Sequence, residues 1–303
     1  MALQKIIPNL WFDREAFEAV RFYTNLFPDG RIISSVTLHD TPSRDTDIVT
    51  FELAGYTFMG INGGPHFTKN PSISFFVNFD PARDPHARER LDHLWGGLSQ
   101  GGRILMPLQA YPFSSHYGWI QDRYDVSWQL ILTDPEGEER PCIIPSLLFT
   151  GSVAGKAEEA LRFHLETFPH SRLGSLVRYP EGMEHEVSAT LMFSDYMLEN
   201  QWFTAMDSGH PHGFQFTEGI SLMVQCDTQQ EIDVLWRRLS ADADAEQCGW
   251  LKDRYGISWQ IVPTSLGQLL ETGNPAQVDR VTKAVLEMKK LDTALLHQAF
   301  DGD

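Results

Sequence analysis

The stretch Gly118 to Gln129, G-W-I-Q-D-R-Y-D-V-S-W-Q, decides the fold because it returns as Gly249 to Gln260, G-W-L-K-D-R-Y-G-I-S-W-Q. Eight of the twelve positions are identical, and the copies are offset by 131 residues throughout. Two tryptophans, a charged pair and a closing glutamine in the same order indicate a tandem duplication. We therefore predict a chain of two related halves.

Each copy of the repeat is typical of a β-hairpin. A polar turn separates a Gly-Trp start from an alternating run of apolar and polar residues. Asp125 and Gly256 hold the fourth turn position, and both residue types suit a left-handed backbone. The repeat therefore predicts the closing hairpin of each half.

The second strand of each hairpin has two different faces, because successive side chains of a strand point to opposite sides. Trp128 and Trp259 lie on one face, which we expect to pack under a helix. The other face carries serine and glutamine in both copies: Ser127, Gln129, Ser258 and Gln260. This polar face is the one available to line a cavity.

Length and composition limit the class of protein. A chain of 303 residues fits two domains of roughly 150 residues each. The net charge of −17, with no basic stripe, excludes nucleic acid as an expected partner. No apolar run approaches the roughly 20 residues that a membrane span needs. Cys142, Cys226 and Cys248 form no metal or disulfide pattern, which favours a cytoplasmic location.

The order of expected elements is β-α-β-β-β, and it occurs twice in each half. We place the first domain at 1–138, the second at 139–264 and a helical tail at 265–303. The strand before the second hairpin is expected to be shortened to Ala243–Gln247, and another strand is expected at Glu186–Phe193. In the tail, Asn274 followed by a proline predicts a helix start. We expect this helix to dock on the body or on a second subunit.

Candidates for catalytic chemistry are few. His210 and His212 flank a proline in a Gly-rich loop just after Asp207, but the sequence fixes no further metal ligand. No nucleophile elbow, reactive cysteine pattern or glycine-rich phosphate loop is present. The sequence therefore offers at most a weak metal site at these three residues.

Several tryptophans are not assigned to the core by their position in an element. Trp11, Trp119 and Trp250 belong to this group, and each could wall an apolar pocket. We include them among the candidate ligand contacts.

Several runs resemble one family over nearly the whole chain. They are L-W-F-D-R-E-A-F-E-A-V-R-F-Y-T-N-L-F-P from Leu10, F-M-G-I-N-G-G-P-H-F from Phe58, I-S-F-F-V-N-F from Ile73 and the first hairpin. The second half matches in G-I-S-L-M-V-Q-C-D-T from Gly219 and in the second hairpin. These runs are similar to the PhnB-like proteins, also labelled 3-demethylubiquinone 3-methyltransferase-like.

The resemblance implies an α+β fold of the glyoxalase/bleomycin-resistance/extradiol-dioxygenase type, the vicinal oxygen chelate superfamily. Two β-α-β-β-β modules in each domain would curl into a cup around a small ligand. Single-domain relatives commonly pair, so the fusion implies an internal pseudo-dimer, and a homodimer of the whole chain stays possible. The methyltransferase label finds no S-adenosylmethionine loop in the sequence.

The resemblance also implies where a divalent metal would bind. Metal-dependent relatives take ligands from the first and last strands of each module, and the last strand supplies a glutamate. Gln129 and Gln260 occupy that last-strand position, while the opening strands offer Asn9 and Ser146. The nearest candidates on the fourth strands are Asn62 and Asp207. One carboxylate among these six positions makes a tight divalent centre improbable.

Our leading hypothesis is a binding protein for a small organic molecule in one or both cups. The expected polar contacts come from both halves: Asn62, Ser127, Gln129, Asp207, Ser258 and Gln260. The alternatives are a metal-dependent enzyme of the glyoxalase or dioxygenase type, and a protein that sequesters an antibiotic or toxin.

Overall fold

The computed structural model describes residues 4–180 and 190–302, and the first half forms two β-α-β-β-β modules in chain order. The first module is β1 (Ile6–Phe12), α1 (Ala16–Leu26), β2 (Arg31–Thr41), β3 (Arg44–Leu53) and β4 (Tyr56–Asn62). The second is β5 (Ile73–Phe79), α2 (Ala87–Leu98), β6 (Arg103–Tyr111), β7 (Ser114–Gln121) and β8 (Ser127–Leu132). The module order predicted for this half is confirmed.

The second half repeats this order and adds helices. The third module is β9 (Ile143–Phe149), η1 (Gly151–Val153), α3 (Ala157–Thr167), β10 (Arg172–Arg178), β11 (Leu191–Leu198) and β12 (Gln201–Asp207). The fourth is β13 (Ile220–Cys226), α4 (Gln229–Leu239), η2 (Ala243–Ala245), β14 (Trp250–Lys252) and β15 (Ser258–Pro263). The tail is α5 (Thr264–Thr272), α6 (Pro275–Glu287) and α7 (Thr293–Asp301). Residues 186–189 of the strand expected at Glu186–Phe193 lie outside the described residues.

One expected strand is wrong. The residues predicted as a strand at Ala243–Gln247 form instead the 3-10 turn η2, in which the Asp242 carboxylate accepts from the Asp244 amide. Aspartate at a turn start competes with strand pairing, because its side chain satisfies the local backbone. β14 consequently begins only at Trp250.

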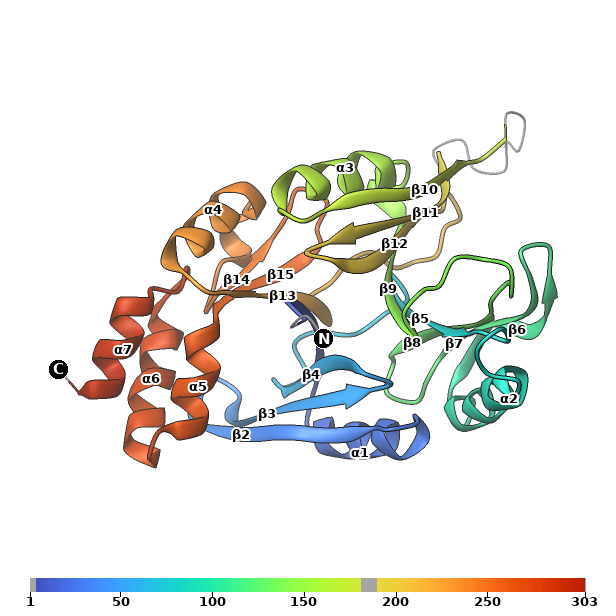
Figure 1. Ribbon diagram of the computed structural model, residues 1–303. Coiled ribbons are helices and arrows are strands. Elements are labelled where there is room, and N and C mark those ends of the chain that lie inside the picture. The colour runs from blue at the N-terminus through green and yellow to red at the C-terminus, as the bar shows by residue number, and fades with distance from the viewer. Residues whose placement is uncertain (1–3, 181–189, 303) are drawn as a thin grey trace.

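The strands form two large sheets, and each sheet draws one module from each half (Figure 1). Sheet A has the order β14-β15-β13-β1-β4-β3-β2, and sheet B has the order β10-β11-β12-β9-β5-β8-β7-β6. The opening strands join the halves: β1 pairs antiparallel with β13, and β5 pairs antiparallel with β9. The expected modules are therefore present, but each cup is built across the two halves rather than within one.

The repeated hairpins behave as predicted at their turns and on their apolar faces. Asp125 and Gly256 have φ values of +63° and +84°, in the left-handed region. Trp128 and Trp259 are fully buried. Trp128 packs against Phe27, which follows α1, and Trp259 packs against Phe168, which follows α3. The tryptophan faces therefore hold the helices against the sheets.

The tail packs on the body beside sheet A. Asn274 caps α6 in a reciprocal arrangement with Gln277, as the Asn-Pro signal predicted. In Figure 1 the three red helices stand at one end of the molecule, α6 reaching β2 and α5 continuing from β15. Among residues 4–180 and 190–302, no helix is long and apolar enough to span a bilayer.

Candidate functional site

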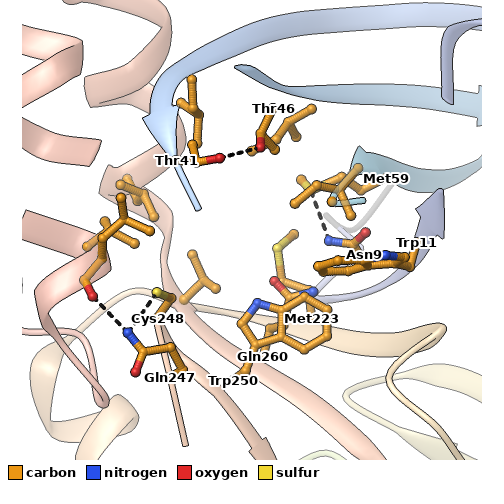
Figure 2. A pocket seen from close by; sticks show the side chains of 18 of the residues that line it. Asn9, Trp11, Thr41, Thr46, Met59, Met223, Gln247, Cys248, Trp250 and Gln260 are labelled. Carbon is orange, nitrogen blue, oxygen red and sulfur yellow. Dashed lines mark hydrogen bonds between the residues drawn. The ribbon is translucent and has the colours of Figure 1, made fainter. Parts of the chain in front are cut away.

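A cavity of about 520 Å³ lies between sheet A and the tail helices. Residues from both edges of the sheet line it, because the sheet curls around the space. The tail closes one side with apolar side chains of α5 and α6, among them Leu266, Leu270 and Val285. In Figure 2, Asn9, Trp11 and Met59 face Gln247 and Cys248 across this space. We call this space the open cup.

The floor of the open cup is formed by the central strands β1, β4, β13 and β15. Asn9 pairs in register with Met59 on one side and with Ser221 on the other, so the three side chains share one face. The Asn9 Nδ2 atom lies 3.5 Å from the Met59 Sδ atom. Gln260 donates from Nε2 to the Ser221 Oγ atom at 2.8 Å. The floor is therefore neutral, with two amides among apolar side chains.

The Gln260 amide is held in one orientation. Because its Nε2 atom binds Ser221, its Oε1 atom is left as the acceptor on the cavity side. No group in the described parts of the chain donates to this oxygen. An amide oxygen without a donor favours a ligand that supplies one.

Aromatic rings form the wall next to the floor. Trp11 and Trp250 meet edge to face with ring centroids 5.9 Å apart, and Phe67 lies 4.9 Å from Trp11. The Trp11 indole donates to the Gly64 carbonyl at 2.7 Å. Any Cβ on Gly63 would lie 2.1 Å from the Trp11 ring, so glycine is required for this packing. The predicted contacts Trp11, Trp250, Ser258 and Gln260 all line this one cavity.

The matching space on sheet B is occupied by the protein's own side chains. Gln129 donates to the Ser74 Oγ atom at 2.8 Å and accepts the Tyr117 hydroxyl at 2.5 Å. Trp119 donates to the Ser127 hydroxyl at 2.8 Å. Tyr117 packs with an apolar cluster whose members include Phe76, Ile144, Trp119, Trp202 and Met206. We call this space the filled cup.

The predicted contacts Asn62 and Asp207 point away from the cups toward the helices of their own modules. The Asn62 Oδ1 atom accepts from the Ala16 amide at 2.8 Å. The Asp207 Oδ1 atom accepts from the amides of Gly155 and Ala157 at 2.8 and 3.1 Å. Both side chains therefore satisfy backbone donors at the start of a helix.

We expect Asn62→Ala to lower the free energy of unfolding by about 0.5–2 kcal/mol, the usual loss for a capping side chain. Asp207→Ala should lower it more, because this buried carboxylate also accepts from the Leu191 amide. Urea unfolding followed by circular dichroism would measure this. Neither substitution should weaken ligand binding in the open cup. A variant that kept its stability and lost ligand binding would show that the substituted side chain contacts the ligand.

The turn carboxylates of the repeat, Asp122 and Asp253, have a structural role that their place in a turn did not predict. Asp122 accepts from the Tyr124 and Val126 amides, the Trp128 indole and the Tyr23 hydroxyl. Burial and the neighbouring carboxylate raise the pKa of Tyr23 well above its usual value of 10, so this phenol stays a donor. Identity in both copies was the available signal for this role.

Asp253 repeats the arrangement, with a histidine in place of the tyrosine. It accepts from the Tyr255 and Ile257 amides, the Trp259 indole and the His164 Nε2 atom, all at 2.9–3.0 Å. Asp253 and His164 are both buried. The carboxylate therefore fixes the hairpin and joins it to α3.

The side chains present do not fit a divalent metal. The inward positions on the central strands of the open cup hold Asn9, Met59, Ser221 and Gln260, which offer no carboxylate, imidazole or thiolate. No group of three or more His, Cys, Asp or Glu suited to a metal ion occurs in the described ranges. Met59, rather than Asn62, is the fourth-strand residue that faces this cup.

The weak metal candidates are held in other contacts. The Asp207 carboxylate binds helix amides, and its Oδ2 atom accepts from the Leu191 amide at 3.0 Å. The His212 Nε2 atom lies 2.7 Å from the Ser208 hydroxyl. The rings of His210 and His212 have centroids 6.0 Å apart. Among the described residues, these three do not form part of any group of three or more side chains that could hold a metal ion.

Paired β-α-β-β-β modules, two curled sheets and a last-strand amide above a central cavity define a glyoxalase-type, or vicinal oxygen chelate, fold. Glyoxalase I from Zea mays is 11% identical, with 87% of this chain and 95% of that chain covered and a TM-score of 0.52, so the two share the fold. A PhnB protein from Bacillus cereus is 38% identical over 43% of this chain and 100% of that one, with a TM-score of 0.38.

The family model described as 3-demethylubiquinone-9 3-methyltransferase matches residues 4–131 and again residues 141–262. The chain belongs to this family and carries two tandem copies of it. No match was found among curated proteins.

The structure does not support the methyl transfer that the family description names. Three of the four strand-to-helix connections contain no glycine, and the fourth, Gly151 to Gly155, forms the 3-10 turn η1. S-adenosylmethionine sites of the common methyltransferase fold need a glycine-rich loop after a strand of a parallel sheet. The described parts of the two cups offer no such loop.

Proposed function

We propose that this chain binds a small, largely apolar organic molecule in the open cup, with the amides of Asn9 and Gln260 as its polar contacts. The observation that carries the proposal is the contrast between the two cups. One holds a cavity of about 520 Å³, within the range of about 300–1,000 Å³ typical of small-molecule sites. The other is filled by the chain's own aromatic residues. The filled cup then serves as the structural partner of the open one.

The chemistry of the open cup favours binding over catalysis. Its ionisable lining residues His66, Asp244 and Glu271 are exposed, and Lys252 forms an ion pair with Glu218 at 2.7 Å. Burial raises the pKa of the Cys248 thiol, which keeps it protonated and unreactive at neutral pH. Sequestration of a toxic molecule is one form of such binding. A cytoplasmic location stays a prediction.

Naphthalene is a suitable first probe, because apolar side chains and aromatic rings form most of the lining of the open cup. At a naphthalene concentration ten times Kd, binding should stabilise the protein by about 1.4 kcal/mol. A thermal-shift titration would detect the corresponding rise in Tm. Ile61→Trp, which fills the cavity from β4, should abolish the effect.

Ile104→Trp is the matched control. Ile104 is exposed on β6 of sheet B, so the same substitution there leaves the open cup intact. The control should retain the full response to naphthalene. An equal response from Ile61→Trp would place naphthalene elsewhere and refute the proposed site.

A further inference from the structure

The two cups hold the same glutamine in the same way. Gln129 and Gln260 are separated by the repeat offset of 131 residues. Each donates from Nε2 to a serine hydroxyl, Ser74 or Ser221, at 2.8 Å. Each serine is the second residue of its strand, β5 or β13. The Oε1 atoms are therefore presented alike to the two cups.

In the filled cup, the glutamine oxygen receives an aryl hydroxyl. The Tyr117 hydroxyl donates to the Gln129 Oε1 atom at 2.5 Å. Tyr111 and Phe113 meet the Tyr117 ring edge to face, with centroids 5.5 and 5.0 Å away. The filled cup thus contains an uncharged phenol, seated among aromatic rings and bound through its hydroxyl.

In the open cup, the chain withdraws the corresponding side chain. The repeat offset puts Cys248 at the place of Tyr117. Cys248 has a φ of +55°, and its amide donates to the Met288 carbonyl at the end of α6. The residues before it form the turn η2 instead of an aromatic-bearing strand. The tail therefore holds this segment at the wall of the cup, where no tyrosine reaches the Gln260 oxygen, and this oxygen faces the cavity.

We infer that the ligand of the open cup is an uncharged aromatic molecule whose ring hydroxyl donates to the Gln260 Oε1 atom, as Tyr117 does to Gln129. This inference rests on the proposed function and narrows its ligand class. The aromatic wall of Trp11, Trp250 and Phe67 suits a planar ring. The lysine of the lining, Lys252, is already paired with Glu218, so its ammonium group is not available to hold a phenolate.

Three probes of nearly the same shape test the hydroxyl: 2-naphthol, 2-methoxynaphthalene and naphthalene. Calorimetric titration should show 2-naphthol binding roughly tenfold more tightly than 2-methoxynaphthalene, which leaves the Gln260 oxygen without a donor. Gln260→Leu should remove this difference. Gln129→Leu, the same change in the filled cup, should preserve it. The preference should also vanish at a pH above the pKa of the naphthol hydroxyl.

A second variant tests the same contact in the filled cup. Tyr117→Ala removes the internal phenol, and added phenol, which has the shape of the lost group, should raise the Tm of this variant more than benzene does. The difference in Tm between the two probes should be larger in this variant than in the wild type, in which Tyr117 already fills this cup. This arm needs no knowledge of the natural ligand.

The outcomes separate the two proposals. If the wild type binds the three naphthalenes with equal affinity, the ligand does not need a ring hydroxyl. This result would overturn the inferred ligand class but not the proposed binding in the open cup. A hydroxyl preference that survives Gln260→Leu would overturn the assigned contact. Failure of every probe to bind would refute both the ligand class and the proposed function.

Discussion

Replacing Asp253 with alanine is expected to lower the free energy of unfolding by about 3–5 kcal/mol, because four buried donors lose their acceptor and each buried donor left unsatisfied costs about 1–3 kcal/mol. The carboxylate is 3% exposed and accepts four hydrogen bonds. Its loss leaves two amides, an indole and the His164 ring without an acceptor. Urea unfolding followed by far-ultraviolet circular dichroism would measure the change.

Two comparisons serve as controls for this prediction, one in the tail and one taken from the repeat. Asp301→Ala removes an exposed carboxylate from α7 and should change stability by less than about 0.5 kcal/mol. His164→Tyr should be tolerated better than His164→Leu, because Tyr23 donates to Asp122 from the matching helix position. If Asp253→Ala unfolds at the same urea concentration as the wild type, the four hydrogen bonds of Asp253 do not stabilise the fold as proposed.

Much of the fold could be predicted because the repeat fixes the periodicity of the chain. The hairpins, the four modules and the capped tail helix all follow from local patterns. The pairing of the modules could not be predicted, because the opening strands β1, β5, β9 and β13 are all short and apolar. Such strands accept either partner, and the choice depends on the assembled molecule.

The site could be predicted in part for the same reason. Period-two geometry placed Gln260 on the polar face of its strand, and its side chain lines the open cup. The same geometry could have shown that Asn62 faces away from the cavity. Asn62 lies an odd number of residues from Met59, so the two side chains point to opposite faces of β4. The difference between the cups depends on Tyr117 and Cys248, which directly precede the two copies of the repeat. It also depends on the hydrogen bond from the Cys248 amide to the Met288 carbonyl, 40 residues further along the chain.

The stability of the protein should depend on pH through Lys69, which ties the aromatic wall to the body. Lys69 is 6% exposed, donates from Nζ to the Trp11 carbonyl and lies 4.0 Å from the centroid of the Phe12 ring. Burial lowers the pKa of Lys69 from 10.5 to about 8, although Glu15, Asp125 and Asp122 oppose the shift. The folded protein therefore loses this proton at a lower pH than the unfolded chain does.

The sign of the effect follows from proton binding. Between pH 8 and 10.5 the unfolded chain binds more protons at Lys69, so stability rises with pH in this window and falls as pH drops through 8. Relative to Lys69→Met, which keeps the stem without the charge, the wild type should gain about 2–3 kcal/mol between pH 7 and pH 10. Comparing urea unfolding of the two proteins cancels the titration of all other groups. A constant difference across this range would mean that Lys69 keeps its ordinary pKa, and that the ammonium is solvated rather than buried against Phe12.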